Sequence, residues 1–225
     1  MDYRSDSPEG TLPLLYGDAH MLAVDKPAGL LSVPGRGADK QDCAAARVRR
    51  AYPDALVVHR LDMATSGLLL MARGPAMQRA LSRAFEQRRV GKRYVALAAG
   101  RIGAPASADD DGWGCIDLPL AADWPKRPRQ VVDAVHGRPS RTRWRILGYD
   151  VARDATRVEL EPVTGRSHQL RVHLLALGHP ILGDVLYAPP AVRERAPRLL
   201  LHASMLEVTH PATGERLRCC SPVPF

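Results

Sequence analysis

The sequence VHRLDMATSG, residues 58–67, lies between two apolar runs of strand length at 55–58 and 68–71. The threonine, serine and glycine that end it are typical turn residues, so Asp62 is expected where a strand ends and a pocket can open. Catalytic groups are often found at such positions. Asp62 is therefore a candidate nucleophile. The simpler alternative is that its carboxylate caps a turn or forms a structural ion pair with Arg60.

The composition predicts one soluble domain with an aliphatic core. The 225 residues are enough to bury a sizeable core, which must be mainly aliphatic because there are only two Phe and three Trp. The four cysteines show no Cys-x-x-Cys spacing, which fits a reducing compartment. The sequence has neither a charged-then-apolar leader nor an apolar run of about 18 residues, so we expect a cytoplasmic protein.

The formal net charge is +8, and only four of the 32 basic residues are lysine. Arginine binds phosphate through a bidentate fork and stacks on bases, so the excess favours a nucleic-acid partner, although a codon bias toward arginine would give the same composition. In residues 141–146 arginine alternates with Thr142, Trp144 and Ile146. A strand here would have one apolar and one cationic face, and the cationic face is either an ordinary solvated surface or a site for a phosphate backbone.

Apolar spacing and turn residues predict a mixture of short strands and helices. Residues 1–11 are polar and are expected to form a flexible tail, with one domain over residues 12–225. The helix over 167–177 is expected to be capped by Ser167 and ended by Gly178. Further strands are expected over 14–25, 94–99, 156–162 and 199–208, further helices over 39–52 and 75–89, and an acidic loop over 104–113.

Several common chemistries have no signature in the chain. The glycine-rich loops of dinucleotide and nucleotide sites are missing, as is the Gly-x-Ser-x-Gly turn of serine hydrolases. His168 and His173 are five residues apart, about 140° around a helix, so they do not easily share a metal. We therefore expect neither a cofactor nor a metal ion.

A second informative segment is GRSHQLRVH, residues 165–173. His168 and Arg171 are three residues apart, so they share one face of the predicted helix near its N-terminus. The partial positive charge of that helix end adds to theirs. The segment therefore predicts a site for a carboxylate or a phosphate.

Together these segments resemble the pseudouridine synthases of the RluA type, over nearly the whole chain from about residue 14. The resemblance implies an α+β catalytic domain with a mixed, mainly antiparallel sheet, flanking helices and a central active-site cleft, and no S4 domain. It implies an RNA partner, specifically the 23S ribosomal RNA hairpin and the tRNA anticodon stem-loop with its uridine at position 32, and a monomeric protein. The motifs that carry the resemblance are HRLD with TSG at 59–67, KRY at 92–94, GRSHQLRVH at 165–173, GHPILGD at 178–184 and LHA at 201–203.

The resemblance also implies the catalytic residues. Asp62 matches the nucleophile, Tyr94 matches the tyrosine that stacks on the base and can act as acid or base, and Arg171 matches the arginine that keeps Asp62 ionised. Burial alone would raise the pKa of an aspartate above about 3.9, and a neighbouring cation offsets this.

Four further residues are implied as substrate-binding: His59, Arg60, Arg166 and His168. An enzyme of this class must extract the uridine from its stack, and Arg60 would fill the space left behind. For Arg60 the alternative remains an ion pair with Asp62 in the folded protein. Asp184 is interpreted as a turn or ion-pair residue.

Two other functions remain as alternatives. A nucleoside or glycoside hydrolase also acts at an anomeric carbon but normally uses two carboxylates with separate roles, and the motifs contain no second acid of that kind. A non-catalytic RNA-binding protein would keep the arginines but would not require Asp62.

Overall fold

The computed structural model describes residues 11–225, which form two compact units. The first unit comprises the described residues up to Lys92 together with His202–Pro224, and the second comprises Arg93–Leu201 with Phe225. The flexible tail predicted for residues 1–11 lies, except for Thr11, outside the described residues. Among residues 11–225, no helix combines the length and apolar character needed to span a membrane.

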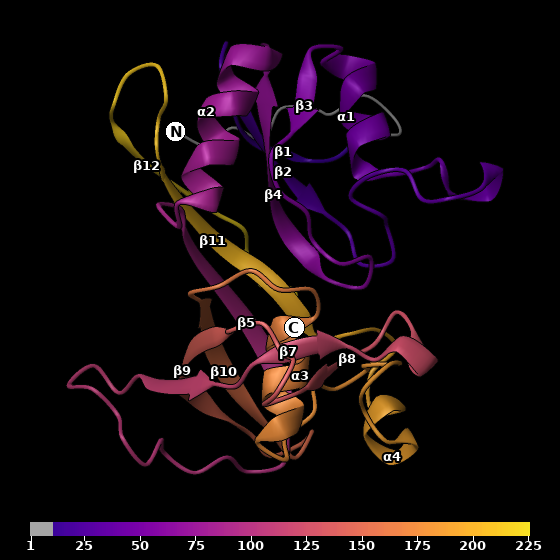
Figure 1. Cartoon of the computed structure of the whole chain (residues 1–225), viewed down its shortest axis with the longest axis vertical. Coiled ribbons are helices and arrows are strands. Elements are labelled where there is room, and N and C mark those ends of the chain that lie inside the picture. Colours follow the sequence, from indigo (N-terminus) through magenta and orange to yellow (C-terminus); the bar gives the residue numbers. More distant parts are fainter. Residues whose placement is uncertain (1–10) are drawn as a thin grey trace. The chain divides into compact units, whose positions relative to one another are not determined.

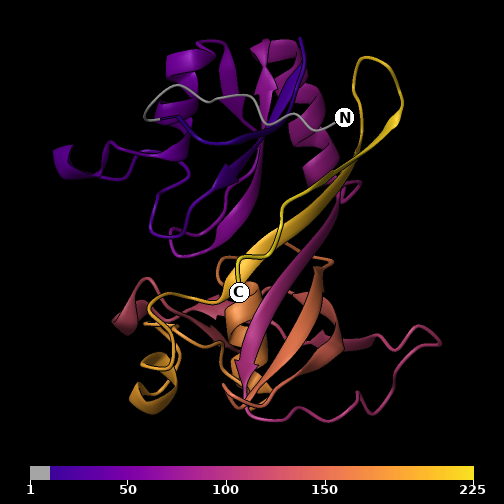
Figure 2. The same ribbon diagram turned by 180° about the vertical axis from the view of Figure 1, so that it is seen from behind.

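The first unit is a sheet with two helices against it (Figure 1). Its centre is β4, which is flanked by β2 on one side and β11 on the other. All strand pairs are antiparallel except β4 with β11. The hairpin of β11 and β12 is drawn in yellow in Figure 2. The elements are β1 (Leu14–Gly17), β2 (Met21–Lys26), α1 (Ala44–Ala51), β3 (Ala55–Val57), β4 (Ser66–Arg73), α2 (Gly74–Glu86), β11 (Leu201–Thr209) and β12 (Arg216–Cys220).

The sequence of β4 explains its central place. Residues 68–72 are fully buried, since β2 and β11 pair with the two edges of β4 and α2 packs against it. The pairing of β4 with β2 runs without a shift from Met21 opposite Ala72 to Lys26 opposite Gly67. This register brings the end of β2 beside the start of β4, directly after the segment that contains Asp62.

The second unit is an antiparallel sheet in the order β5, β10, β9 and β6, with a separate two-stranded ribbon of β7 and β8. Helix α3 packs on β8, β9 and β10. In β10 the even-numbered side chains from Thr156 to Pro162 are buried and the intervening ones are half-buried. The elements are β5 (Gly91–Ala99), β6 (Gly114–Asp117), β7 (Leu120–Ala122), β8 (Gln130–Val132), β9 (Arg141–Asp150), β10 (Ala155–Pro162), α3 (Gln169–Ala176) and the short α4 (Pro190–Arg193).

The predicted α+β class with a mixed, mainly antiparallel sheet is confirmed, whereas the predicted ends of the helices differ from those observed. Helix α1 begins at Ala44 rather than 39, because Cys43 is extended and bridges to Leu31. Helix α2 ends at Glu86 rather than 89, because the backbone of Arg88 turns into the left-handed region at φ 57°.

The start of α3 also differs from the prediction. Ser167 is not its cap, because His168 precedes the helix in a left-handed conformation at φ 56°. The side chain of His168 makes no capping hydrogen bond, and the Oε1 of Gln169 accepts a hydrogen bond of 3.0 Å from the backbone N–H of Arg166, which ties the first residue of α3 to the segment before it. The predicted stop at Gly178 is confirmed by its φ of 85°.

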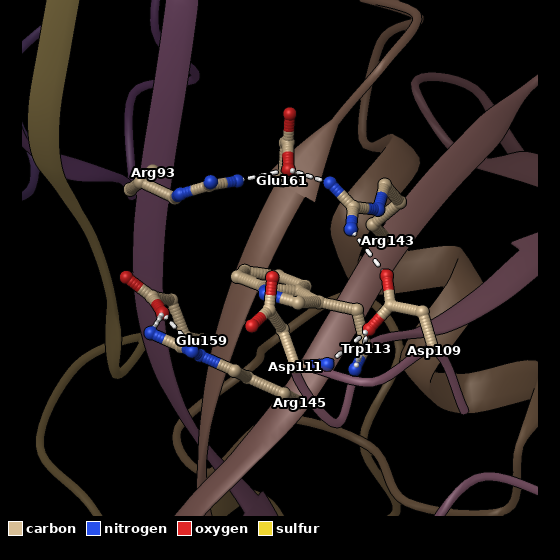
Figure 3. Close-up of polar contacts among 8 residues, drawn as sticks. All are labelled: Arg93, Asp109, Asp111, Trp113, Arg143, Arg145, Glu159 and Glu161. Carbon is tan, nitrogen blue, oxygen red and sulfur yellow. Dashed lines mark hydrogen bonds and ion pairs between the residues drawn. The ribbon is translucent and has the colours of Figure 1, made fainter.

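Strand β9 alternates as predicted, with Thr142 and Trp144 buried and the arginines on the other face. That face is not wholly cationic, however, because each arginine meets a carboxylate. Arg143 contacts Asp109 of the acidic loop at 2.6 Å and Glu161 at 2.9 Å, and Arg93 also pairs with Glu161 (Figure 3). An ordinary solvated surface therefore describes this face of β9 better than a site for a phosphate backbone. The remaining pairs are Arg141 with Asp117 at 2.8 Å and Arg145 with Glu159 at 2.7 Å.

Candidate active site

Asp62 begins a tight turn between β3 and β4. Its backbone C=O accepts a hydrogen bond of 3.1 Å from the N–H of Thr65, and its side chain is half-buried. The turn therefore covers residues 62–65, whereas Ser66 and Gly67, predicted as turn residues, already belong to β4. A half-buried aspartate at the start of a fixed turn is accessible to a ligand and still held in place.

The residues on either side of Asp62 are fixed by the segment that follows β2. The Oγ of Ser32 donates to the C=O of Leu61 at 2.7 Å and accepts from its N–H at 3.0 Å. The C=O of Met63 accepts a hydrogen bond of 2.8 Å from the N–H of Gly29. Both backbone neighbours of Asp62 are thus held by a loop about thirty residues earlier in the chain.

Lys26 links the loop that follows β2 to the turn of Asp62 from inside the protein. Its side chain is 0% exposed, and Nζ donates to the C=O groups of Pro27 at 2.9 Å, Leu30 at 2.8 Å and Met63 at 3.2 Å. Burial lowers the pKa of Lys26 to about 8, although the carboxylates of Asp62 and Asp25 act in the opposite direction. The first unit therefore supplies Asp62 with a buried cation of its own.

The family resemblance implies that electrostatic role for Arg171, and Lys26 was not selected from the sequence. A signal was present, because Lys26 is a charged residue at the end of the buried run of β2, directly before a Pro-Ala-Gly turn. A lysine in that setting is rarely buried without a set of oxygen acceptors.

His59, predicted to bind substrate, lies against β4 and α2. Its Nε2 accepts a hydrogen bond of 2.9 Å from the backbone N–H of Leu70, which leaves the ring proton on Nδ1, and the ring stacks on Phe85 at 4.4 Å. Burial first, and then the charge of Lys92, lowers the pKa of His59 to about 3, so the ring is neutral. Arg60, the next residue, is exposed.

Arg171, of the second unit, forms a bidentate ion pair with Asp184. Its Nε and Nη2 lie 2.7 Å and 2.6 Å from the two carboxylate oxygens, and the side chains are only 3% and 1% exposed. One of these oxygens also accepts the backbone N–H groups of Leu186 and Tyr187. The interpretation of Asp184 as an ion-pair residue is confirmed by its contact with Arg171.

The second unit also holds Tyr94, Arg166 and His168. Tyr94 lies in β5 opposite Leu160 of β10 and is half-buried. The Nδ1 of His168 lies 2.6 Å from the hydroxyl of Tyr187, which accepts the backbone N–H of Gln130 at 2.8 Å. Arg166 reaches the C=O of Pro139 at 3.4 Å. Tyr187 was missed by the sequence analysis, because its place depends on the turn that Asp184 organises.

Comparison with known proteins covers almost the whole chain. The family described as RNA pseudouridylate synthase matches residues 20–176, a range that contains Asp62, Tyr94 and Arg171. The dual-specificity RNA pseudouridine synthase RluA of Escherichia coli K12 is 50% identical over 217 residues, which are 96% of this chain and 95% of that protein. The protein of the same name from Haemophilus influenzae is 44% identical over 209 residues, 93% of this chain and 92% of its own.

Solved structures show the same fold. Human RNA pseudouridylate synthase domain containing 1 is 29% identical with a TM-score of 0.79, and the match covers 98% of this chain and 87% of the human chain. Human RNA pseudouridylate synthase domain containing 4 has a TM-score of 0.70 at 24% identity, with 94% and 88% covered.

Proposed function

The chain belongs to the RNA pseudouridylate synthase family and isomerises uridine in RNA to pseudouridine, and we propose that Asp62 is the nucleophile of this reaction. The observation that carries the proposal is the fixed turn of Asp62. Leu61 is held by Ser32, and Met63 by Gly29 and Lys26, while the carboxylate itself remains half-exposed. Such preorganisation is what a reacting group requires.

The reaction needs one ionised carboxylate. The bond between ribose C1′ and uracil N1 breaks, the base turns over, and C1′ rejoins the base at C5. N1 takes up a proton and C5 loses one, so the isomerisation consumes no co-reactant. Attack on the sugar, attack on the base and removal of a sugar proton all require the charged form of Asp62. The buried ammonium group of Lys26 supports that form electrostatically.

We assign the proton exchange at C5 to Tyr94, together with stacking on the base, and electrostatic support of Asp62 to Arg171. For Arg171 the supporting observation is its rigid, bidentate attachment to Asp184, which holds the guanidinium in one orientation. For Tyr94 the support is its position in the KRY segment of the sequence resemblance.

Four residues are proposed to bind the RNA. The exposed Arg60 follows His59, whose half-buried ring is held by the backbone N–H of Leu70, so Arg60 is free to extend outward and fill the space that a flipped uridine leaves. Arg166 and His168 lie at the start of α3, where backbone N–H groups favour a phosphate.

The RNA targets are inferred from the relatives. Because these are named dual-specificity enzymes, we propose two classes of substrate here, a 23S ribosomal RNA hairpin and a tRNA anticodon stem-loop. We further propose that residues 12–225 act as one catalytic domain and that the protein is a cytoplasmic monomer. Sedimentation of the protein alone tests the monomeric state.

Stem-loop RNA labelled with tritium at uracil C5 tests the reaction and the nucleophile together. We expect stoichiometric release of tritium into water with pseudouridine in the product, no release by Asp62→Asn, and unchanged RNA binding by that variant. Asp42→Asn is the control, because Asp42 is an exposed residue paired with Arg47. Free uracil would indicate a hydrolase, binding without release would indicate a passive binder, and release by Asp62→Asn would refute the assignment of the nucleophile.

A further inference from the structure

Four side chains of the first unit form a chain of hydrogen bonds that ends beside the Asp62 turn. The Oγ of Ser66 lies 2.9 Å from Nδ1 of His202, and Nε2 of His202 lies 3.0 Å from Oγ of Ser221. The hydroxyl of Ser221 also bonds to the carboxyl group of Asp25. Ser66, His202 and Ser221 are all at most 5% exposed.

When Asp25 is ionised and His202 is neutral, the carboxylate of Asp25 sets the direction of the protons in this chain. A carboxylate only accepts hydrogen bonds, so the hydroxyl of Ser221 donates to it. The oxygen of Ser221 then accepts from the N–H at Nε2 of His202. Because a neutral imidazole carries one N–H, its Nδ1 accepts, and the hydroxyl of Ser66 must donate to it.

The end of this chain meets the Asp62 turn where two backbones are in close contact. Ser66 directly follows Thr65, whose N–H closes the turn, and it pairs in parallel register with His202. At the next pair, Gly67 opposite Ala203, a Cβ on the glycine would lie only 2.3 Å from the backbone oxygen of Ala203. The bond between Ser66 and His202 therefore lies directly beside the closest backbone contact between β4 and β11.

We propose that His202 is a positioning residue for Asp62, acting through Ser66. The inference rests on the proposed role of Asp62. Ser32 holds the residue before Asp62, and the bond from Ser66 to His202 fixes the strand immediately after the turn. Without the imidazole nitrogens the bond between Ser66 and His202 is lost. The carboxylate of Asp62 can then still react, but it is no longer held in its orientation toward the uridine.

The test compares His202→Phe with His202→Gln and Ser66→Ala under single-turnover conditions. Phenylalanine keeps a ring of similar size but no nitrogen, and we expect the rate to fall about tenfold to a hundredfold, the range expected for a displaced reacting group, with KM for RNA nearly unchanged. Glutamine supplies one donor and one acceptor, as neutral histidine does, and should recover a large part of the rate. Ser66→Ala removes the bond between Ser66 and His202 and should lower the rate in the same way.

His210→Phe is the matched control. His210 is also buried and has both ring nitrogens hydrogen-bonded, but its partners are Asp18 and the backbone of Ala212 and Thr213 in the turn after β11. Its replacement should lower the melting temperature without lowering the rate of folded enzyme. A wild-type rate in His202→Phe and Ser66→Ala, equal effects at 202 and 210, or a change confined to KM would overturn the proposal. Because Asp62→Asn is measured alongside, loss of activity there with full activity in His202→Phe would refute only the positioning role.

Discussion

Replacement of Lys26 by methionine tests whether the buried ammonium group holds the Asp62 turn. Methionine keeps much of the aliphatic stem but leaves the carbonyl groups of Pro27, Leu30 and Met63 without their donor. Hydrogen bonds from a charged donor contribute about 1.5–3 kcal/mol each, so the three bonds contribute roughly 4–9 kcal/mol. Burial opposes this, because a shift of the Lys26 pKa from 10.5 to about 8 corresponds to about 3 kcal/mol.

The contribution of the three hydrogen bonds minus the cost of burying the charge predicts that Lys26→Met lowers the free energy of unfolding by an amount on the order of 3 kcal/mol. The same change should lower the single-turnover rate at least tenfold, since Met63 loses one of its two attachments. Chemical denaturation and tritium release measure the two effects. Lys40→Met is the control, because Lys40 is exposed and its replacement should change the unfolding free energy by less than about 0.5 kcal/mol.

The pH dependence of the difference in unfolding free energy between the wild type and Lys26→Met provides a second readout. Because the folded-state pKa of Lys26 lies below its unfolded value, the folded protein loses the proton first as the pH rises. The stability advantage of the wild type over Lys26→Met should therefore grow between pH 8 and about 10.5, by up to about 3 kcal/mol. A difference that stays flat across this range, or a variant as stable and active as the wild type, would refute the reasoning.

Three further predictions concern the frame around the candidate site. Gly67→Ala should cost more than about 2 kcal/mol of unfolding free energy, because Gly67 has a φ of 109° and a Cβ there would meet the backbone of Ala203. Gly74→Ala, at a φ of 77° but in open space, should cost about 1 kcal/mol. Equal losses by chemical denaturation would argue against the close approach of the two backbones. Asp184→Asn should cost about 3–5 kcal/mol of unfolding free energy, because it removes the negative charge from a buried, bidentate ion pair with Arg171. A loss below about 1 kcal/mol in the same measurement would contradict this. Burial would raise the pKa of Asp18, but hydrogen bonds from Tyr16, from the backbone and from His210 lower it to about 2. About 2 kcal/mol of folding stability should therefore be lost as the pH falls from about 4 to 2. The acid unfolding of Asp18→Asn should lack this loss.

The elements that could be predicted from sequence are those whose residues reveal their own environment. The apolar run of β4 and the alternation in β9 and β10 directly reflect how each strand is buried. The motifs around Asp62 and Arg171 likewise identified the family, since they are local in the sequence. Helix ends were predicted less well, because the start of α3 is set by the left-handed backbone of His168 and not by a cap from Ser167.

The features that could not be predicted depend on partners far away in the chain. Lys26 is buried because Met63, 37 residues later, brings an acceptor to it. His202 and Ser66 are 136 residues apart and meet only through the parallel pairing of β4 with β11. The predicted cationic face of β9 is neutralised by carboxylates from a neighbouring strand and from the acidic loop, which spacing within one strand does not reveal.

The most direct test of the role of Asp62 is a single turnover with enzyme in excess over C5-tritiated stem-loop RNA, with binding of the RNA measured in the same samples. We predict complete tritium release by the wild type, no release above background by Asp62→Asn, and an equal Kd for both proteins. Release by Asp62→Asn at any rate close to that of the wild type would contradict the assignment of Asp62 as the nucleophile.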